Sequence, residues 1–346
     1  MTALRRLLFP TFGQALLTLL AAALIAGIGG SVVTFAVLRA SFHGGTLADC
    51  PNPDGACWPF VVSRLGQFMF GLYPAGERWR VALALGALLA LLAGLLLPSL
   101  RRWATVALIL GFPVASYALL RGGFAGLAPV PARQWGGLFL TLLITADAML
   151  LAVPLGLALA LARLSSLPAV RLCAGAFVEL WRGVPTVGVL FVAITLFPVF
   201  LPGEAQTDPL LRLIGAFMLM VSAFVAEAFR GSLQAFPLGQ YQAARALGLG
   251  HWASLRLVVL PQTVATTLPN LINITIAMLK ETTLVVIIGT YDLLGMVQSA
   301  ILDPKWQSER VAYTGYAFVA GTYWALCIGI STLSQRIERR SARQRG

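Results

Sequence analysis

The chain has 346 residues, of which 58% are hydrophobic and only 11% are charged. Soluble domains carry about 25% charged residues, so this composition excludes an ordinary soluble protein and predicts an all-α polytopic membrane protein. The net charge of +12 does not indicate nucleic-acid binding. The arginines gather at the ends of apolar segments, whereas a nucleic-acid site needs one basic face with interleaved aromatic residues.

Eight apolar segments are candidates for spans, since a helix needs about 20 residues to cross a bilayer. They are 12–38, 81–100, 103–120, 135–162, 184–203, 213–226, 257–279 and 311–335. The first is longer than the apolar core of a signal peptide and is interpreted as a retained span. The segment 282–302 carries a single charge, Asp292, and is the alternative for a ninth crossing, which would place the five C-terminal arginines outside. We interpret it instead as the end of the segment that starts at 257, followed by a helix at the outer surface.

The basic residues predict the orientation of the spans. If the N-terminus is inside, the inner loops and tails hold 15 lysines and arginines and the outer segments hold 9. Cytoplasmic loops carry the excess of positive charge, so both termini are expected on the cytoplasmic side.

The long outer loop, 39–79, contains two cysteines around a turn, in the order Cys50-Pro51-Asn52-Pro53-Asp54-Gly55-Ala56-Cys57. Disulfides persist outside the cytoplasm, so a bond between Cys50 and Cys57 is expected. The alternative is a pair of free thiols.

Motifs for nucleotide, metal and hydrolytic chemistry are missing from the sequence. The two lysines, Lys280 and Lys305, do not follow a glycine, so the chain has no P-loop. His43 and His251 fall on opposite sides of the membrane in the predicted topology. The sequence also lacks HExxH, paired Cys/His and GxSxG motifs. We therefore expect no catalytic residues, no metal and no cofactor bound by this chain, which leaves transport, channel activity or scaffolding.

One polar stretch interrupts the apolar segments, and residues 239–252 of it read GQYQAARALGLGHW. Pro237 is typical of a helix start, and Gly248 and Gly250 are typical of a helix end. On helical spacing, Gln240, Ala243, Ala244 and Leu247 share one face. The helix either lies on the membrane surface or docks a soluble partner. A membrane-surface helix has a larger apolar face, so docking is favoured.

The same stretch resembles a known motif. The spacing Gln242-Ala243-Ala244-x3-Gly248-x9-Val258-x-Leu260-Pro261 is similar to the EAA loop of ATP-binding-cassette (ABC) importer permeases. Gln242 stands where that motif has an acid, and Val258 stands where it has isoleucine. Three further segments resemble those of polar amino-acid permeases, in the same order along the chain: Glu179-Leu180-Trp181-Arg182-Gly183-Val184-Pro185, Ala226-Glu227-Ala228-Phe229-Arg230-Gly231 and Leu279-Lys280-Glu281-Thr282-Thr283-Leu284.

The region before residue 136 also carries a resemblance. Phe70-Gly71-Leu72-Tyr73-Pro74, followed by Glu77-Arg78-Trp79-Arg80, is similar to the M-type permease subunit of general L-amino-acid uptake systems. The resemblance implies an N-terminal extension, 1–135, with three spans and a periplasmic loop (39–79). It also implies a type I importer (MetI-like) core of five helices, 136–340, with its coupling loop at 237–261.

The family implies a function and partners. The chain would be one permease of an ATP-driven amino-acid importer in the bacterial inner membrane. It would work with a second homologous permease, two ATPase subunits that hold ATP and magnesium, a periplasmic amino-acid-binding protein and the surrounding lipid. The residues expected to couple to the ATPase are Gly239, Gln240, Gln242, Ala243, Ala244, Arg245, Leu247 and Gly248.

The alternative is a stand-alone channel or secondary transporter for small polar solutes. Such a protein is expected to repeat its midplane ionisable residues in both halves, but Asp147 has no counterpart in the second half.

Polar residues inside or beside the spans are candidates for the substrate pathway, because a charge at mid-bilayer costs about 2.5–3.5 kcal/mol on insertion scales. Asp147 could hold a substrate ammonium or pair with a neighbouring helix. Glu227 and Arg230 could instead form a structural clamp, and the amides could satisfy backbone groups freed by Pro261 and Pro269. The full set of candidates is Asp147, Glu227, Asn270, Asn273, Lys280, Glu281 and Thr282.

Overall fold

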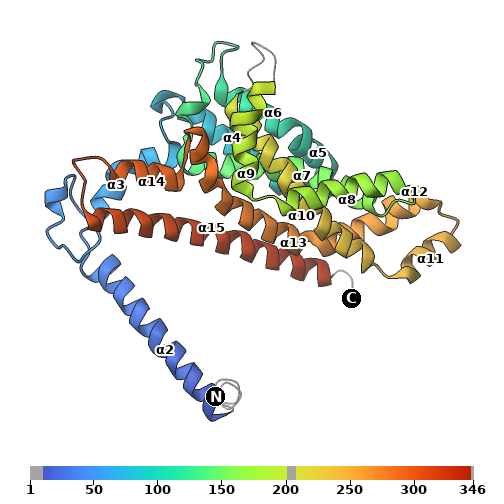
Figure 1. Cartoon of the computed structure of the whole chain (residues 1–346), viewed down its shortest axis with the longest axis horizontal. Helices are drawn as coiled ribbons and strands as arrows, with labels where there is room; N and C mark the ends of the chain where they lie inside the picture. The colour runs from blue at the N-terminus through green and yellow to red at the C-terminus, as the bar shows by residue number, and fades with distance from the viewer. Residues whose placement is uncertain (1–10, 201–207, 344–346) are drawn as a thin grey trace. The chain divides into compact units, whose positions relative to one another are not determined.

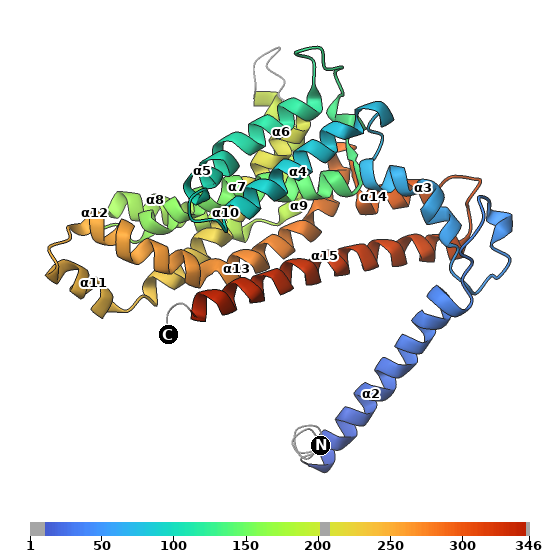
Figure 2. The ribbon, with the colours of Figure 1, turned by 180° about the vertical axis from the view of Figure 1, so that it is seen from behind.

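The computed structural model describes residues 11–200 and 208–343, with side chains described as far as residue 336. The first ten residues of the expected extension and the last residues of the expected span 184–203 lie outside the described part. The helices of Figures 1 and 2 are α2 (Phe12–Val33), α3 (Trp58–Phe70), α4 (Arg78–Gly94), α5 (Arg101–Val106), α6 (Phe112–Arg121), α7 (Gly137–Arg163), α8 (Pro168–Gly183), α9 (Thr186–Phe191), α10 (Pro209–Gln234), α11 (Leu238–Ala246), α12 (His251–Ser254), α13 (Leu260–Glu281), α14 (Leu293–Ile301) and α15 (Glu309–Arg343). Short π-helical segments lie at Thr34–Leu38, Ala107–Gly111, Val192–Leu196 and Leu255–Val259, and short 3₁₀ segments at Leu47–Asp49, Ala75–Glu77, Ala132–Gln134, Phe197–Phe200 and Thr282–Ile288. The two-residue strand β1 is Tyr291–Asp292.

The prediction of an all-helical membrane protein is confirmed, and the spans can be compared one by one. Within the described residues, six helical stretches are long and apolar enough to cross a membrane: Phe12–Leu38, Arg101–Arg121, Gly137–Arg163, Pro209–Gln234, His251–Ile288 and Glu309–Arg336. Each corresponds to one of the eight expected spans. The expected span 184–203 is instead the second half of a helix pair bent by 102° after Gly183. The expected span 81–100 is α4, a helix of 17 residues that ends at Gly94.

The segment 282–302 does not form one helix. Residues 282–288 continue α13 as a 3₁₀ helix that ends at Gly289 with φ of +74°. Then β1 pairs with Gly136 and Gly137, and α14 follows as a helix of nine residues. The structure therefore matches the interpretation of a long segment followed by a separate short helix.

The chain divides into two compact units. One takes in the residues up to 66 and 297–321, and the other takes in 67–296 and the residues from 322 onward. The expected boundary at 135/136 is not one of the points of this division. The division into an N-terminal extension (1–135) and a permease core (136–340) stays a prediction.

The second unit is built around α7 and α10, which bury a long apolar face against each other. Ala148, Ala152, Gly156 and Ala160 recur every fourth residue on α7, and all four are buried. A side chain at Gly156 would meet Val225 of α10 at 2.5 Å. Small residues at this spacing allow membrane helices to approach closely, so packing of the backbones holds this pair together.

Helix α6 is tied to the start of α10 by a polar cluster. Asp208 caps α10, accepting a hydrogen bond from the backbone N–H of Leu210 at 2.9 Å. Its other carboxylate oxygen accepts hydrogen bonds from the Tyr117 hydroxyl at 2.9 Å and the Arg121 guanidinium at 3.0 Å. The extension thereby braces a helix of the expected core.

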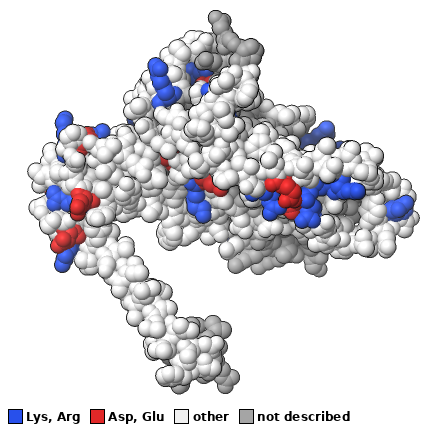
Figure 3. All heavy atoms as spheres, in the orientation of Figure 1, with Lys and Arg blue, Asp and Glu red and all other residues white. Residues whose placement is uncertain are grey.

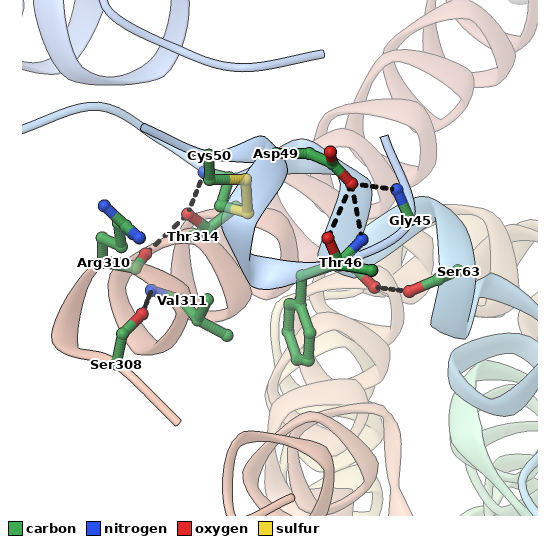
Figure 4. The surroundings of a disulfide bond; sticks show 11 residues. Gly45, Thr46, Asp49, Cys50, Ser63, Ser308, Arg310, Val311 and Thr314 are labelled. Carbon is green, nitrogen blue, oxygen red and sulfur yellow. Dashed lines mark hydrogen bonds between the residues drawn. A yellow bond between two sulfur atoms is a disulfide. The ribbon is translucent and has the colours of Figure 1, made fainter. Parts of the chain in front are cut away.

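In the first unit, Cys50 and Cys57 form a disulfide with their Cα atoms 5.6 Å apart, and both residues are buried. The backbone N–H of Cys57 donates to the Thr314 hydroxyl of α15 at 2.9 Å, and Asp49 accepts hydrogen bonds from Gly45 and Thr46 (Figure 4). Gly55 has no room for a side chain, since a Cβ there would overlap the Arg39 carbonyl oxygen. The loop is therefore a closed, internally bonded structure.

Candidate functional site

The short polar helix predicted from the sequence is α11, and it connects α10 to α12 and α13. Pro237 is its N-terminal cap, and the helix runs for nine residues. At its other end Gly248 has φ of +79°. The Gly248 N–H donates to the Arg245 carbonyl at 2.9 Å, and the Leu249 N–H donates to the Ala244 carbonyl at 3.1 Å. This is a Schellman motif, which stops a helix at a residue that tolerates positive φ.

The expected role of Gly250 as a helix end needs a correction. Gly250 is the N-terminal cap of the next helix, α12, and the Ser254 N–H bonds back to its carbonyl at 2.9 Å. Two helices therefore meet at Leu249. One Gly ends the first helix, because its φ is positive, and the other starts the second from an extended conformation.

A side-chain clamp fixes the angle between α11 and α12. The Tyr241 hydroxyl lies 2.8 Å from Nδ1 of His251, and the two rings meet edge to face. His251 in turn contacts the ring of Trp252. The clamp lets α11 and α12 act as one stiff connection.

The residues of the expected docking face of α11 differ in how far their side chains are exposed. Gln240, Ala243 and Leu247 are exposed, and Leu247 is 82% exposed. Ala244 is only 3% exposed, so its side chain is not available to a partner. The coupling role expected of both alanines stays a prediction, and only Ala243 presents its side chain at the surface. The other expected coupling residues, Gly239, Gln242, Arg245 and Gly248, are exposed.

One face of α13 is both polar and exposed, although the helix is part of an apolar span. Its members recur at alternating steps of four and three residues, the spacing of one helix face. We call Thr266, Asn270, Asn273, Ala277 and Lys280 the α13 stripe, and all five are exposed. A lysine and two amides facing lipid would be costly, so this face requires water or another protein chain opposite it.

The end of the α13 stripe formed by Thr266 and Asn270 opens into a cavity of about 430 Å³ between α10 and α13. Gln262, Thr266 and Asn270 line one side, and Glu227, Ser232 and Phe236 are among the residues of the other side. The cavity brings together two of the sequence-predicted pathway residues, Glu227 and Asn270. It ends at Pro237, where α11 begins.

Glu227 is also the centre of an ionic cluster. Its carboxylate pairs with Arg163 of α7 and with Arg230 of α10, the latter at 2.7 Å, and Arg182 of α8 lies 3.9 Å away. Arg163 reaches Glu179 of α8 at 3.5 Å. Figure 3 shows acidic atoms with basic atoms beside them in the region of α10. The Glu227–Arg230 pair proposed from sequence is present, within a network the sequence did not reveal.

The remaining candidates lie apart from the cavity. Asp147 is buried in α7, and its Oδ1 has no hydrogen-bond partner. Glu281 is half-buried at the end of α13 and accepts a hydrogen bond from Thr186, and the buried Thr282 hydroxyl donates to the Leu279 carbonyl. Lys280 and Glu281 therefore point to different surroundings, as their adjacency on a helix predicts.

Sequence reasoning missed Gln262, Thr266 and Ser232 as cavity residues. Thr266 could have been found from the spacing of four residues to Asn270. Ser232 and Gln262 carried no signal, because only the pairing of α10 with α13 brings them together.

Comparison with known proteins agrees with this geometry. Residues 152–343 match the family of binding-protein-dependent transport system inner membrane components. The inner membrane amino-acid ABC transporter permease protein YhdY of Escherichia coli K12 is 42% identical over 339 residues, covering 97% of this chain and 91% of that protein. The glutamate/glutamine/aspartate/asparagine transport system permease protein BztC of Rhodobacter capsulatus is 30% identical and covers 85% of this chain and 80% of its own length.

A solved structure shares the fold of 59% of the chain. It is described as an amino acid ABC transporter with histidines, and it is 32% identical with a TM-score of 0.53, covering 59% of this chain and 92% of its own. The family match extends over more than half of the chain, and the Escherichia coli relative matches nearly all of it. The chain is therefore a member of the binding-protein-dependent transport system inner membrane component family, the transmembrane permease subunits of ABC transporters.

Proposed function

We propose that this permease subunit imports amino acids across the bacterial inner membrane, with both termini in the cytoplasm. In this proposal it forms the pathway with a second homologous permease. Two ATPase subunits, which hold the ATP and magnesium, dock on α11, and a periplasmic amino-acid-binding protein delivers the substrate. The names of the relatives support the substrate class. The orientation is the one expected from the eight apolar segments of the sequence, in which 15 basic residues fall in inner loops and tails and 9 in outer segments.

The α13 stripe is the observation that carries the proposal. A polar, exposed face on a membrane-spanning helix is typical of a surface that lines a water-filled pathway. Its end at Thr266 and Asn270 opens into the cavity between α10 and α13, directly beside the start of α11. Asn270, Asn273 and Lys280 are therefore the pathway residues that we favour. Asp147, Glu281 and Thr282 remain candidates for contacts with the substrate.

Substitutions in α11 test the coupling role. Ala243→Trp places a bulky side chain on the exposed face, and Gly248→Val removes the residue that tolerates positive φ at the helix end. Both are expected to abolish ATP-driven uptake while membrane insertion stays intact. Gly175→Ala on α8 is the matched control, since it lies outside the expected coupling residues and a Cβ there meets nothing within 4 Å. Normal uptake by both variants would remove the coupling role.

The rival function is a stand-alone channel or secondary transporter. The purified chain in liposomes distinguishes the two functions, because the importer needs its ATPase and the rival does not. We expect no uptake of radiolabelled amino acids by the chain alone and uptake after addition of the other subunits and ATP. Uptake by the chain alone would favour the rival.

A further inference from the structure

The ionic cluster around Glu227 has a place in the coupling pathway that the proposed function does not assign. Building on that function, we propose that the Arg163–Glu227 pair at the centre of the cluster locks α10 to α7, so that these two helices follow α11 as one body. The loop that contains α11 connects α10 to α13, and α13 then moves separately from α10. Arg163 and Glu227 are the positioning residues in this mechanism.

The contacts of the cluster reach across three helices. Glu227 accepts hydrogen bonds from Arg163 of α7, and it pairs with Arg230 one turn later on its own helix. Its side chain is 19% exposed, as is that of Arg163. Partly buried, charge-assisted hydrogen bonds are stronger than exposed ion pairs, which contribute little. The link between α7 and α10 is therefore the strong one in this network.

The network continues to the end of α10. Arg230 donates a hydrogen bond to the Gln234 side chain at 2.6 Å, and Gln234 is the last residue of α10. Only Ala235, Phe236 and Pro237 separate it from α11. A displacement of α11 is thus passed through a very short linker to the end of α10, which is connected through Arg230 and Glu227 to Arg163 of α7.

The other side of α10 is built differently. Toward α13, Glu227 and Ser232 face the cavity of about 430 Å³. Among the ion pairs of the described residues, none joins α10 to α13. Packed elements that are not bonded to each other can shift between discrete arrangements, as in shear motions. The cavity is therefore the place where α10 and α13 separate and close.

The test uses the whole complex, with its other permease, its ATPase and its binding protein, reconstituted in liposomes. Uptake of a mixture of radiolabelled L-amino acids and hydrolysis of ATP are measured in the same vesicles. Arg163→Gln removes the ion pair between α7 and α10, leaves their apolar packing, and leaves the Glu227–Arg230 pair. It is expected to keep ATP hydrolysis and to lower uptake per ATP by about tenfold, a usual size for coupling between sites. Glu227→Gln is expected to do the same, and Glu227→Asp to recover part of the loss.

Glu179→Gln is the matched control, because Glu179 touches only the edge of the cluster and is 69% exposed. It is expected to stay within about twofold of wild type. Unchanged uptake per ATP in Arg163→Gln and Glu227→Gln would overturn the proposal. So would a parallel loss of hydrolysis and uptake, which is the mark of a purely structural role.

Two further outcomes are decided in the same experiment. If neither variant assembles, Glu227→Asp is measured instead, because it keeps the charge but shortens the side chain that reaches Arg163. Lower uptake per ATP in Glu227→Asp then supports the lock, and wild-type uptake per ATP overturns it. If wild-type vesicles show no ATP-driven uptake, the proposed function fails, whereas coupled wild-type vesicles with unaffected variants reject only the locking role.

Discussion

Two connections between helices in this protein are built on opposite principles. The connection 39–57 is closed by the Cys50–Cys57 disulfide, and its cysteines are buried. The connection 235–259 is held by a backbone cap at Gly248 and by the Tyr241–His251 clamp, and it leaves Leu238, Leu247 and Trp252 exposed. The groups of the first connection bond mainly to one another, through the disulfide and through the hydrogen bonds that Asp49 accepts. The second is stiff but presents large apolar side chains, which is typical of a surface that binds a partner.

Stiffness and stability therefore come from separate sources in the two connections. A covalent bond restricts the unfolded chain. A Schellman cap and a side-chain hydrogen bond fix a direction at little gain in stability. Substitutions should affect stability in one connection and partner binding in the other.

The largest effect is expected for Leu247→Asp. A hot-spot residue at the centre of an interface costs about 2–4 kcal/mol when it is lost, which corresponds to about 30-fold to 1,000-fold in affinity. We expect the variant to lose co-purifying ATPase while its thermal unfolding stays at the wild-type temperature. Phe42→Asp, on an exposed apolar residue of the other connection, is the control and should retain the ATPase. Equal ATPase binding by Leu247→Asp and wild type would contradict the docking role.

The next largest effect is expected from removal of the disulfide. Closing a loop of this length gives about 2.5 kcal/mol in the chain-entropy estimate. Cys50→Ser combined with Cys57→Ser should lower the free energy of unfolding by that amount, measured with denaturant in detergent. Reductant should reproduce the loss in wild type, and Cys173→Ser, at an exposed free cysteine, should not. ATPase binding should be unchanged. A change in ATPase binding would contradict the view that the connection 39–57 contributes to stability and not to partner binding.

A smaller effect is expected for Tyr241→Phe, which removes the hydroxyl from the clamp. The loss of one hydrogen bond costs about 0.5–1.5 kcal/mol. Backbone amides of α11 and α12 should exchange hydrogen faster by a corresponding factor, measured by mass spectrometry, while those of α7 stay protected. Tyr316→Phe on α15 serves as the control. If α11 exchanges no faster in Tyr241→Phe, the backbone cap alone fixes the helix.

The smallest effect is expected for Asp49, which is exposed. Backbone hydrogen bonds from Gly45 and Thr46 hold the pKa of its carboxyl below the usual value. Because the folded pKa is lower than the unfolded one, the stabilisation is present above the unfolded pKa of about 3.9 and is lost as pH falls through the folded pKa. Asp49→Asn should therefore speed exchange of the Gly45 and Thr46 amides at pH 6. The difference from wild type should vanish in strong acid, and its persistence there would exclude this carboxylate as the cause.

Most of the coupling loop was predictable from local signals, whereas most of the pathway was not. The EAA-like spacing from Gln242 to Pro261 placed the loop, and glycine at 248 marked the helix end. The spacing could not show that Ala244 turns inward, because that depends on the path of the chain after the helix. The lock between Arg163 and Glu227 joins residues 64 positions apart, and no local pattern predicts such a pair.

Residue types and spacings of a few residues were enough to show which segments are apolar enough to enter a membrane, where helices start and stop, and which family motifs are present. Other properties emerged only from the folded chain. These are the side of α13 that is left open, the arginines that meet Glu227, and the end of α4 at Gly94. They depend on which helices pack together, and packing joins residues that are distant in the chain.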